Sequence, residues 1–142
     1  FVDAIIEGRE IDIDNKGNMY RDFTYVDDIA HSIRLLIDVV PIRPNNKDEI
    51  SNIDSLSPVA PFRIVNIGNS EKVPLLDFIN AIENELGIKA KRNYMDMQKG
   101  DVHATWANTE LLKHLTGYLP NTNFEEGIKH FVISNLFKVP SI

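Results

Sequence analysis

Apolar and polar residues along the chain follow two different periods. In five segments the apolar residues recur every three to four positions, which is the spacing of one face of an α-helix. The predicted helices cover residues 1–8, 26–40, 74–86, 108–117 and 124–136. In other segments apolar and polar residues alternate, or β-branched residues gather, as they do in short strands. The predicted strands cover residues 10–14, 19–25, 62–67 and 88–97.

Turn signals between these segments predict how they connect. Asn15, Lys16, Gly17 and Asn18 form a turn cluster, so residues 11–25 are predicted to fold as a β-hairpin. The apolar stripe of residues 26–40 predicts a helix that faces a core. Residues 43–61 contain three prolines and little periodicity, which indicates a long surface loop. The fold class that follows is α/β, a mixed α+β lobe with about five helices and four short strands.

Size and composition limit the class of protein further. A chain of 142 residues with 43% apolar content is large enough for one core and too short for two ordinary domains, so residues 1–142 are predicted to be one domain. No apolar run approaches the roughly 20 residues that span a bilayer. The sequence has no cysteine, which excludes disulfides and thiolate chemistry. We therefore expect no membrane partner and a cytoplasmic location.

The charge balance bears on possible partners. A formal net charge of −6 argues against a general nucleic-acid binder, because such proteins neutralise many phosphates with a basic surface. One small anion held by one or two arginines remains compatible with this charge, since the field of a pocket differs from that of the whole molecule.

The sequence lacks the common motifs of catalytic and cofactor-binding sites. It contains no Gly-rich dinucleotide fingerprint, no phosphate loop and no nucleophile elbow. No tyrosine is followed four positions later by a lysine, and the histidines lack metal-ligand spacing; these are His31, His103, His114 and His130. Catalytic, cofactor-binding and metal-binding residues are therefore not predicted within the chain.

Four residues at predicted strand ends and in polar loops are candidates for ligand binding: Arg21, Asn66, Gln98 and Asp101. Ligands of open α/β folds are met at such positions, and a guanidinium suits phosphate or carboxylate. Simpler interpretations compete with this one. Arg21 can pair with a neighbouring aspartate on the surface, and Asn66 and Asp101 can be ordinary turn residues.

Three motifs, taken together, resemble a known family. They are Arg-Asp-Phe-Thr-Tyr-Val-Asp-Asp-Ile at residues 21–29, Asn-Ile-Gly-Asn at 66–69, and Met-Gln-Lys-Gly-Asp-Val at 97–102 with Ala-Thr-Trp-Ala at 104–107. In this order and spacing the chain resembles the C-terminal half of nucleotide-sugar epimerases of the extended short-chain dehydrogenase/reductase family. The UDP-glucuronate 4-epimerase type is the nearest resemblance, and it extends over nearly all of the sequence.

The resemblance implies a substrate-binding lobe beside a Rossmann domain that holds NAD and carries a tyrosine-lysine catalytic pair. Arg21 matches an arginine that contacts the diphosphate of the UDP-sugar. Gln98 and Asp101 match a loop that closes over the nucleotide, and Asn66 matches an asparagine near the phosphates. The full-length protein is expected to be a homodimer. Because Phe1 is not an initiator methionine and already lies in a predicted helix, we expect a fragment that is inactive alone.

Other functions stay open at this point. Within the same family, the alternatives are a UDP-hexose or UDP-N-acetylhexosamine epimerase, a dehydratase or a decarboxylase, because these enzymes share the substrate-binding lobe. A different class is a free-standing α/β binding module without an active site.

Overall fold

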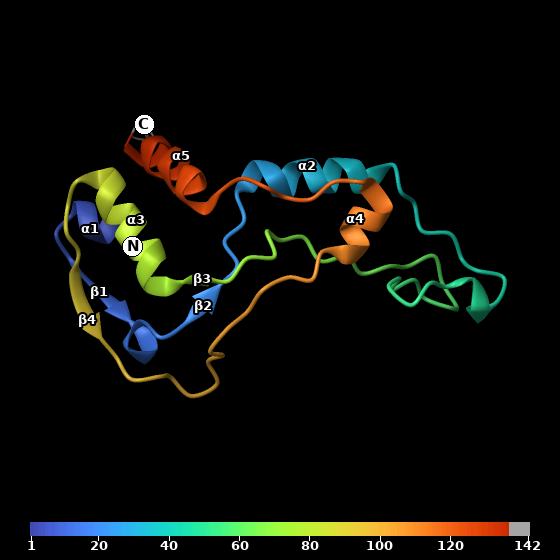
Figure 1. The fold of residues 1–142 in the computed structure, drawn as a ribbon, viewed down its shortest axis with the longest axis horizontal. Helices are drawn as coiled ribbons and strands as arrows, with labels where there is room; N and C mark the ends of the chain where they lie inside the picture. Colours follow the sequence, from blue (N-terminus) through green and yellow to red (C-terminus); the bar gives the residue numbers. More distant parts are fainter. Residues whose placement is uncertain (137–142) are drawn as a thin grey trace, which may run out of the picture. The chain divides into compact units, whose positions relative to one another are not determined.

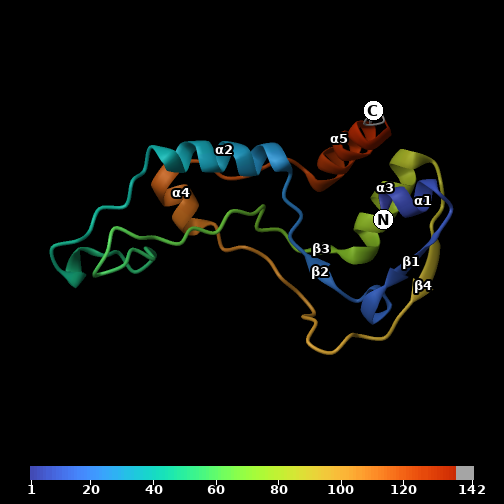
Figure 2. The ribbon, with the colours of Figure 1, turned by 180° about the vertical axis from the view of Figure 1, so that it is seen from behind.

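The computed structural model describes residues 1–136, and contacts within the chain gather into two compact units (Figures 1 and 2). Within the described residues, unit 1 comprises Phe1–Phe23, Glu71–Thr105 and residues 122–136. Unit 2 comprises Thr24–Ser70 and Trp106–Asn121. The assignment of the whole chain to one substrate-binding domain stays a prediction.

The secondary structure confirms the mixed α/β class with five α-helices and four short strands among the described residues. Unit 1 holds the helices α1 (Val2–Ile6), α3 (Leu75–Leu86) and α5 (Phe124–Leu136), the strands β1 (Glu10–Ile13), β2 (Tyr20–Arg21), β3 (Val73–Pro74) and β4 (Lys91–Tyr94), and the 3₁₀ turn η1 (Asp14–Gly17). Unit 2 holds α2 (Val26–Ile37), α4 (Glu110–Thr116) and the 3₁₀ turn η2 (Lys47–Glu49).

The predicted hairpin over residues 11–25 is wrong. β1 pairs in parallel with β4, and β2 pairs antiparallel with β3. Between β1 and β2, Asn15, Lys16 and Gly17 all have positive φ angles of 48°, 53° and 82°. This coiled connection does not pair the two strands, and the Lys16 backbone N–H instead bonds the Met95 carbonyl at 2.9 Å.

Gly17 is the tightest point of this connection. A Cβ added at Gly17 would lie 2.5 Å from Cδ2 of Leu76, and its φ of 82° disfavours any L side chain. We expect Gly17→Ala to destabilise the fold by about 1–2 kcal/mol from the backbone alone and by more because Leu76 must move. The control is Gly87→Ala, which has a φ of 66° but no atom within 4 Å of the added Cβ. Equal losses for both variants in urea unfolding would contradict the steric contribution.

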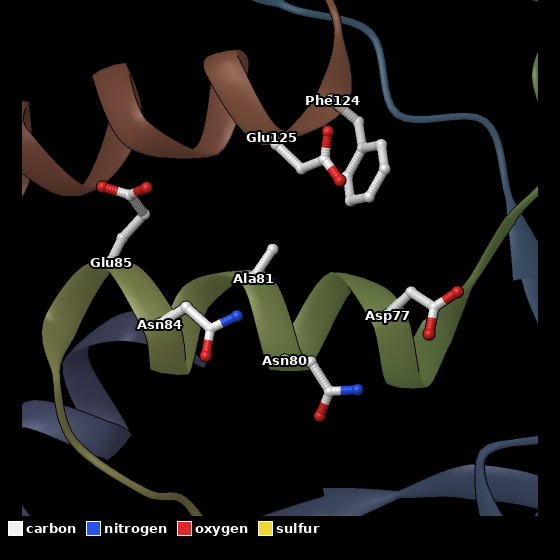
Figure 3. Close-up of a pocket in the computed structure, with 7 residues that line it drawn as sticks. All are labelled: Asp77, Asn80, Ala81, Asn84, Glu85, Phe124 and Glu125. Atoms are coloured by element: carbon white, nitrogen blue, oxygen red, sulfur yellow. The ribbon is translucent and has the colours of Figure 1, made fainter.

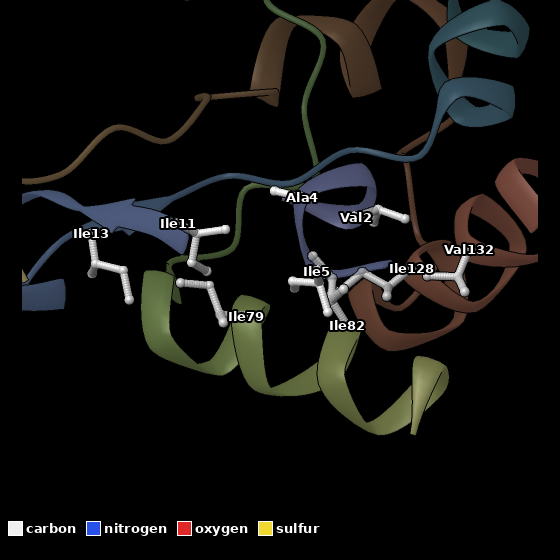
Figure 4. Packing of buried hydrophobic residues seen from close by; sticks show 9 residues of the cluster. All are labelled: Val2, Ala4, Ile5, Ile11, Ile13, Ile79, Ile82, Ile128 and Val132. Atoms are coloured by element: carbon white, nitrogen blue, oxygen red, sulfur yellow. The ribbon is translucent and has the colours of Figure 1, made fainter. Parts of the chain in front are cut away.

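The core of unit 1 lies where α3 packs against β1, α1 and α5 (Figure 4). Its helical members follow the predicted apolar stripes, and its strand members alternate, since Ile11 and Ile13 point to the same side of β1. The buried cluster consists of Val2, Ala4, Ile5, Ile11, Ile13, Ile79, Ile82, Ile128 and Val132.

A carboxylate is buried beside this core. Glu83 of α3 accepts hydrogen bonds from Lys89 Nζ at 2.6 Å, from Arg92 Nη2 at 2.7 Å and from the Ala90 backbone N–H at 3.1 Å. Burial raises the pKa of Glu83, but the hydrogen bonds from Lys89 and Arg92 outweigh it and lower the pKa to about 2. The ion pair between Glu83 and Arg92 ties the C-terminal part of α3 to β4.

In unit 2, α2 packs against α4 (Figure 1). Asp28 and Ser32 are buried on α2, and Asp28 Oδ1 accepts a 2.5 Å hydrogen bond from the Tyr118 hydroxyl. The helix was correctly predicted, but its stripe does not face a core as expected. Ile33 and Ile37 are exposed to solvent.

The predicted strand over residues 62–67 is also wrong, because the described residues form no strand there. The segment is held by side chains: Arg63 makes two hydrogen bonds to the carboxylate of Asp54 at 2.8 and 2.9 Å, and the Ile64 backbone N–H bonds Ser55 Oγ at 3.0 Å. A strand needs a neighbouring strand to satisfy its backbone groups, and none pairs with residues 62–67 in the described part of the chain. The predicted loop before it contains η2.

The hydrogen bond between Tyr118 and Asp28 makes the stability of unit 2 depend on pH. Burial and the hydrogen bond to Asp28 raise the pKa of Tyr118 to about 12. Because the folded state holds the proton more tightly than the unfolded state, this contribution to stability is complete below pH 10 and is lost as the pH rises toward 12. We expect Tyr118→Phe to reduce the fall in stability between pH 10 and 12. Unfolding curves at several pH values test this, and identical pH profiles would contradict it.

Candidate functional site

Arg21 ends strand β2 and carries the positive charge of the predicted site. Its Nη1 donates a 2.8 Å hydrogen bond to the Tyr20 carbonyl, and its Nη2 lies 3.4 Å from Oδ1 of Asp101. The latter distance is long for a charge-assisted bond, which is usually about 2.7–2.9 Å. The side chains of Arg21 and Asp101 are 29% and 31% exposed. The guanidinium is therefore loosely paired and open to solvent, with further N–H groups to offer an anion.

Asp101 reaches Arg21 although the two residues are 80 positions apart. A turn aims its side chain, because the Asp101 N–H bonds the Gln98 carbonyl at 3.2 Å and Gly100 takes a φ of 90°. Beyond the turn, Tyr20 fastens the chain from both sides: its N–H bonds the His103 carbonyl at 3.0 Å and its carbonyl accepts from the Thr105 N–H at 3.2 Å. The bridge to β2 thus sets Asp101 beside the next residue of that strand.

Gln98 belongs to the same loop and faces a different partner. Its Nε2 donates to Oδ1 of Asp14 at 3.2 Å, and the side chain is exposed. Asp96, two positions before Gln98, makes a 3.3 Å ion pair with Lys16 of η1. The structure therefore places Gln98 on the loop of Asp101 and attaches that loop to η1.

Asn66, the fourth predicted residue, lies in unit 2 on the segment 62–67 and is exposed. The other three predicted residues lie in unit 1. The structure therefore brings Arg21 and Asp101 into contact, places Gln98 in the same loop, and locates Asn66 in a separate unit.

Aromatic residues support the pair in ways that the sequence did not predict. The rings of Tyr20 and His103 meet edge to face with centroids 5.6 Å apart. Phe23 stacks on Phe78 of α3 with centroids 3.8 Å apart and an angle of 5° between the rings. Alternation along the strand puts Phe23 on the side of Arg21, and Phe78 lies on the apolar stripe of residues 74–86, but nothing in the spacing points to His103. These contacts fix the chain on either side of Arg21.

A groove lies between α3 and α5 in unit 1, with a volume of about 370 Å³ (Figure 3). None of the four predicted residues lines it. The lining residues are Asp77, Asn80, Ala81, Asn84, Glu85, Phe124 and Glu125. Three carboxylates and no basic side chain make this groove unsuitable for a diphosphate, which carries negative charge itself.

Two searches of the described residues gave no further candidate site. No cluster of histidine, aspartate and glutamate in residues 1–136 has the arrangement of a metal site. Within the same residues, no helix is both long and apolar enough to cross a bilayer. Arg21 and Asp101 offer a donor and an acceptor to a ligand with both phosphate and hydroxyl groups.

The fold of this chain is also found in solved structures. It matches parts of solved nucleotide-sugar enzymes, including a UDP-glucuronic acid 4-epimerase from Bacillus cereus in complex with UDP-glucuronic acid and NAD, at a TM-score of 0.70 and 24% identity over 96% of this chain and 38% of that one. A UDP-glucose 4-epimerase from Thermotoga maritima matches at a TM-score of 0.72 and 21% identity, covering 95% of this chain and 37% of that one. At these identities the likeness shows the fold.

Comparison with curated protein sequences gives higher identities than the solved structures do. A probable UDP-glucuronate 4-epimerase of Rhizobium meliloti is 46% identical over 132 residues, and Protein CapI of Staphylococcus aureus is 44% identical over 132 residues. Each match covers 93% of this chain. The resemblance to part of a nucleotide-sugar epimerase of the UDP-glucuronate 4-epimerase type, which the three motifs indicated, is confirmed. No protein-family model matches the chain.

The matches also set the extent of the likeness. This chain spans only 39% of the length of these curated relatives. The activities of these relatives therefore belong to proteins that are more than twice as long as this chain.

Proposed function

We propose that this chain is the diphosphate-binding part of an NAD-dependent nucleotide-sugar 4-epimerase that interconverts UDP-glucuronate and UDP-galacturonate. The observation that carries the proposal is the pair of Arg21 and Asp101, two residues of the family motifs that meet from 80 positions apart. The 46% identity to the Rhizobium meliloti relative supports the UDP-glucuronate type.

The geometry suits the task that we assign to it. Epimerisation at C4 requires the sugar to turn over between removal and return of hydrogen, so the enzyme must hold the ligand elsewhere. The partly exposed guanidinium of Arg21 supplies a charge-assisted contact to phosphate. The loop of Asp101 and Gln98 is attached at both ends, to η1 and to β2, and offers polar groups to the nucleotide. Asn66 is proposed as a further contact to the phosphates.

NAD is assigned to the rest of the longer protein. The 142 residues contain no Gly-rich fingerprint and no tyrosine-lysine pair of the required spacing, so the residues of this chain do not fit an NAD site. We therefore expect residues 1–142 alone to leave UDP-sugars unchanged. The homodimeric state and the cytoplasmic location are proposed for the complete enzyme.

A chimera provides the sharpest test of this function. The 132 matching residues of the Rhizobium meliloti relative are replaced by this chain, and the chimera is incubated with UDP-glucuronate and NAD. We expect UDP-galacturonate to form, as followed by NMR of the anomeric protons, while UDP-glucose and UDP-N-acetylglucosamine remain unchanged. A chimera that folds, binds NAD and converts none of the three sugars would favour a binding module without enzymatic function.

A second candidate function is favoured by the breadth of the structural likeness. A dTDP-glucose 4,6-dehydratase from Bacillus anthracis matches at a TM-score of 0.70, similar to the values for the epimerases. The fold therefore also suits a dehydratase or a UDP-hexose epimerase, and a decarboxylase stays an alternative from the family resemblance. In the product analysis of the complete enzyme, loss of water from the sugar would identify a dehydratase, loss of carbon dioxide a decarboxylase, and conversion of UDP-glucose to its C4 epimer a UDP-hexose epimerase.

A further inference from the structure

The strands β1 and β4 end at the same level of their sheet. Ile13 of β1 lies opposite Tyr94 of β4 in the parallel register, so both chains leave the sheet side by side (Figure 1). Asp14 is the first residue beyond β1, and the loop that carries Gln98 begins just beyond β4. The end of the sheet therefore brings Asp14 close to this loop, although 84 positions separate Asp14 from Gln98 in the sequence.

Backbone hydrogen bonds fix the start of this loop against the chain beyond β1. The Met95 N–H donates to the Ile13 carbonyl, and the Met95 carbonyl accepts from the Lys16 N–H, both at 2.9 Å. In addition, Lys16 Nζ lies 3.3 Å from Oδ1 of Asp96. Asp14 has a defined place beside the loop, because backbone hydrogen bonds to the loop flank it on both sides in the sequence.

The hydrogen bond between Asp14 and Gln98 has a defined direction. Gln98 Nε2 donates to Asp14 Oδ1 at 3.2 Å. A carboxylate accepts hydrogen bonds and has none to donate, so it binds the NH₂ group of an amide and not its oxygen. Asp14 thereby fixes which arm of the Gln98 amide faces η1. The other arm, Oε1, is available to a ligand, because the side chain of Gln98 is exposed.

We propose that Asp14 is a positioning residue, which orients the Gln98 amide so that Oε1 accepts a hydrogen bond from the nucleoside of the substrate. This inference deepens the proposed function and rests on it. The diphosphate of a UDP-sugar presents oxygens that accept hydrogen bonds, so it has nothing to donate to Oε1, whereas the N–H and hydroxyl groups of a nucleoside do. In this division of tasks Arg21 binds the diphosphate and Gln98 binds the nucleoside.

The energetic reason for such a residue is preorganisation. An exposed glutamine side chain has several rotatable bonds and loses this freedom when it contacts a ligand, which lowers the affinity. The hydrogen bond to Asp14 restricts the Gln98 amide before the ligand arrives, so part of this loss has already occurred. Removal of the Asp14 carboxylate should therefore weaken binding only while Gln98 is present.

A double-mutant cycle on the complete polypeptide tests this role. Asp14→Ala, Gln98→Ala and the double variant are titrated with UDP and with uridine in a calorimeter. We expect each single variant to bind both ligands about two- to tenfold more weakly, the range of one neutral hydrogen bond, and the double variant to bind no more weakly than Gln98→Ala. Losses that multiply in the double variant would overturn the proposal, as would losses confined to UDP.

Two further variants separate orientation from charge. Asp14→Asn keeps an oxygen that accepts from the Gln98 amide, so it should restore most of the affinity lost in Asp14→Ala. Asp12→Ala removes an equal charge from β1, where Asp12 Oδ1 accepts from Asn93 Nδ2 at 2.8 Å, and it should bind UDP as tightly as the unaltered polypeptide. If either variant binds UDP as weakly as Asp14→Ala, charge or folding accounts for the loss and the proposal is wrong.

The orientation of the amide can also be followed without a ligand. Gln98 is the only glutamine among the 142 residues, and the signal missing from the Gln98→Ala protein assigns its side-chain amide in an NMR spectrum with ¹⁵N-labelled glutamine. We expect this signal to move toward that of free glutamine in Asp14→Ala, and an unchanged signal would overturn the proposal. A polypeptide that follows the expected pattern with UDP and uridine but converts no UDP-sugar would contradict the proposed function and not this inference.

Discussion

Replacing Glu83 by alanine is expected to destabilise unit 1 by about 3 kcal/mol. The Glu83 carboxylate is buried and accepts hydrogen bonds from Lys89 and Arg92, and removing one partner of a buried ion pair typically costs about 3–5 kcal/mol. The lower end applies here because the side chain of Lys89 is 80% exposed and can return to water. The pKa of about 2 leads to a similar figure, since a depression from 4.5 corresponds to roughly 3 kcal/mol.

The control for this variant lies two residues further along the same helix. Glu85 is exposed on α3, so Glu85→Ala should change the free energy of unfolding by less than about 0.5 kcal/mol. Urea unfolding at pH 7 measures both variants. Similar losses for the two would show that the contribution comes from the helix and its charge rather than from the buried contacts.

The pH profile separates the ion pair from simple packing. Because the folded-state pKa of Glu83 lies below its usual value, the stabilisation is complete above about pH 4.5 and is lost as the pH falls toward 2. The unaltered chain should therefore lose stability more steeply than Glu83→Ala over this range. Parallel profiles would mean that Glu83 keeps an ordinary pKa in the folded state.

The helices were predictable because their signal is local. Each apolar stripe of three to four residue spacing became a helix. The predicted side of α3 faces the core, whereas α5 buries Ile128 and Val132 but leaves Phe131 and Leu136 exposed. The importance of Glu83 was also accessible from this spacing, because it lies one and four positions from Ile82 and Ile79 on the buried side of α3. A carboxylate at such a position needs basic partners, and Lys89 and Arg92 follow in the sequence.

Strand pairing and the orientation of α2 were not predictable in this way. A strand pattern such as that of residues 62–67 does not say which strand will be its neighbour, and the hairpin prediction failed because β1 pairs with β4, about 80 positions away. The stripe of α2 indicates a buried side, but Ile33 and Ile37 are exposed in the described part of the chain. Local sequence patterns therefore predict most of the helices and strands, whereas the pairing of the strands depends on long-range contacts that only the structure shows.

The candidate site was predictable only as a list of residues. Spacing placed Arg21, Asn66, Gln98 and Asp101 at strand ends and in loops, and the family resemblance gave them a shared ligand. The meeting of Arg21 with Asp101 depends on the bridge between Tyr20 and residues 103–105, for which the sequence holds no local signal. The same bridge explains why His103 was missed.

Arg21→Ala is expected to weaken UDP-sugar binding by the complete enzyme by about ten- to a hundredfold. A hydrogen bond to a charged group contributes about 1.5–3 kcal/mol, which corresponds to this range of affinity. The loss should be confined to ligands with phosphate, so that UDP binds more weakly while uridine binds as before. Isothermal titration with both ligands measures the difference, and raising the salt concentration should reduce it.

Stability distinguishes this role from a structural one. The pair of Arg21 and Asp101 is part-exposed and 3.4 Å apart, so it contributes at most about 1 kcal/mol to folding, and Arg21→Ala should remain folded. Arg21→Lys keeps the charge but loses the planar fork, and an intermediate affinity for UDP is expected. Unchanged affinity of a folded Arg21→Ala protein for UDP would mean that Arg21 serves only Asp101, because a diphosphate contact cannot be removed without a loss of binding.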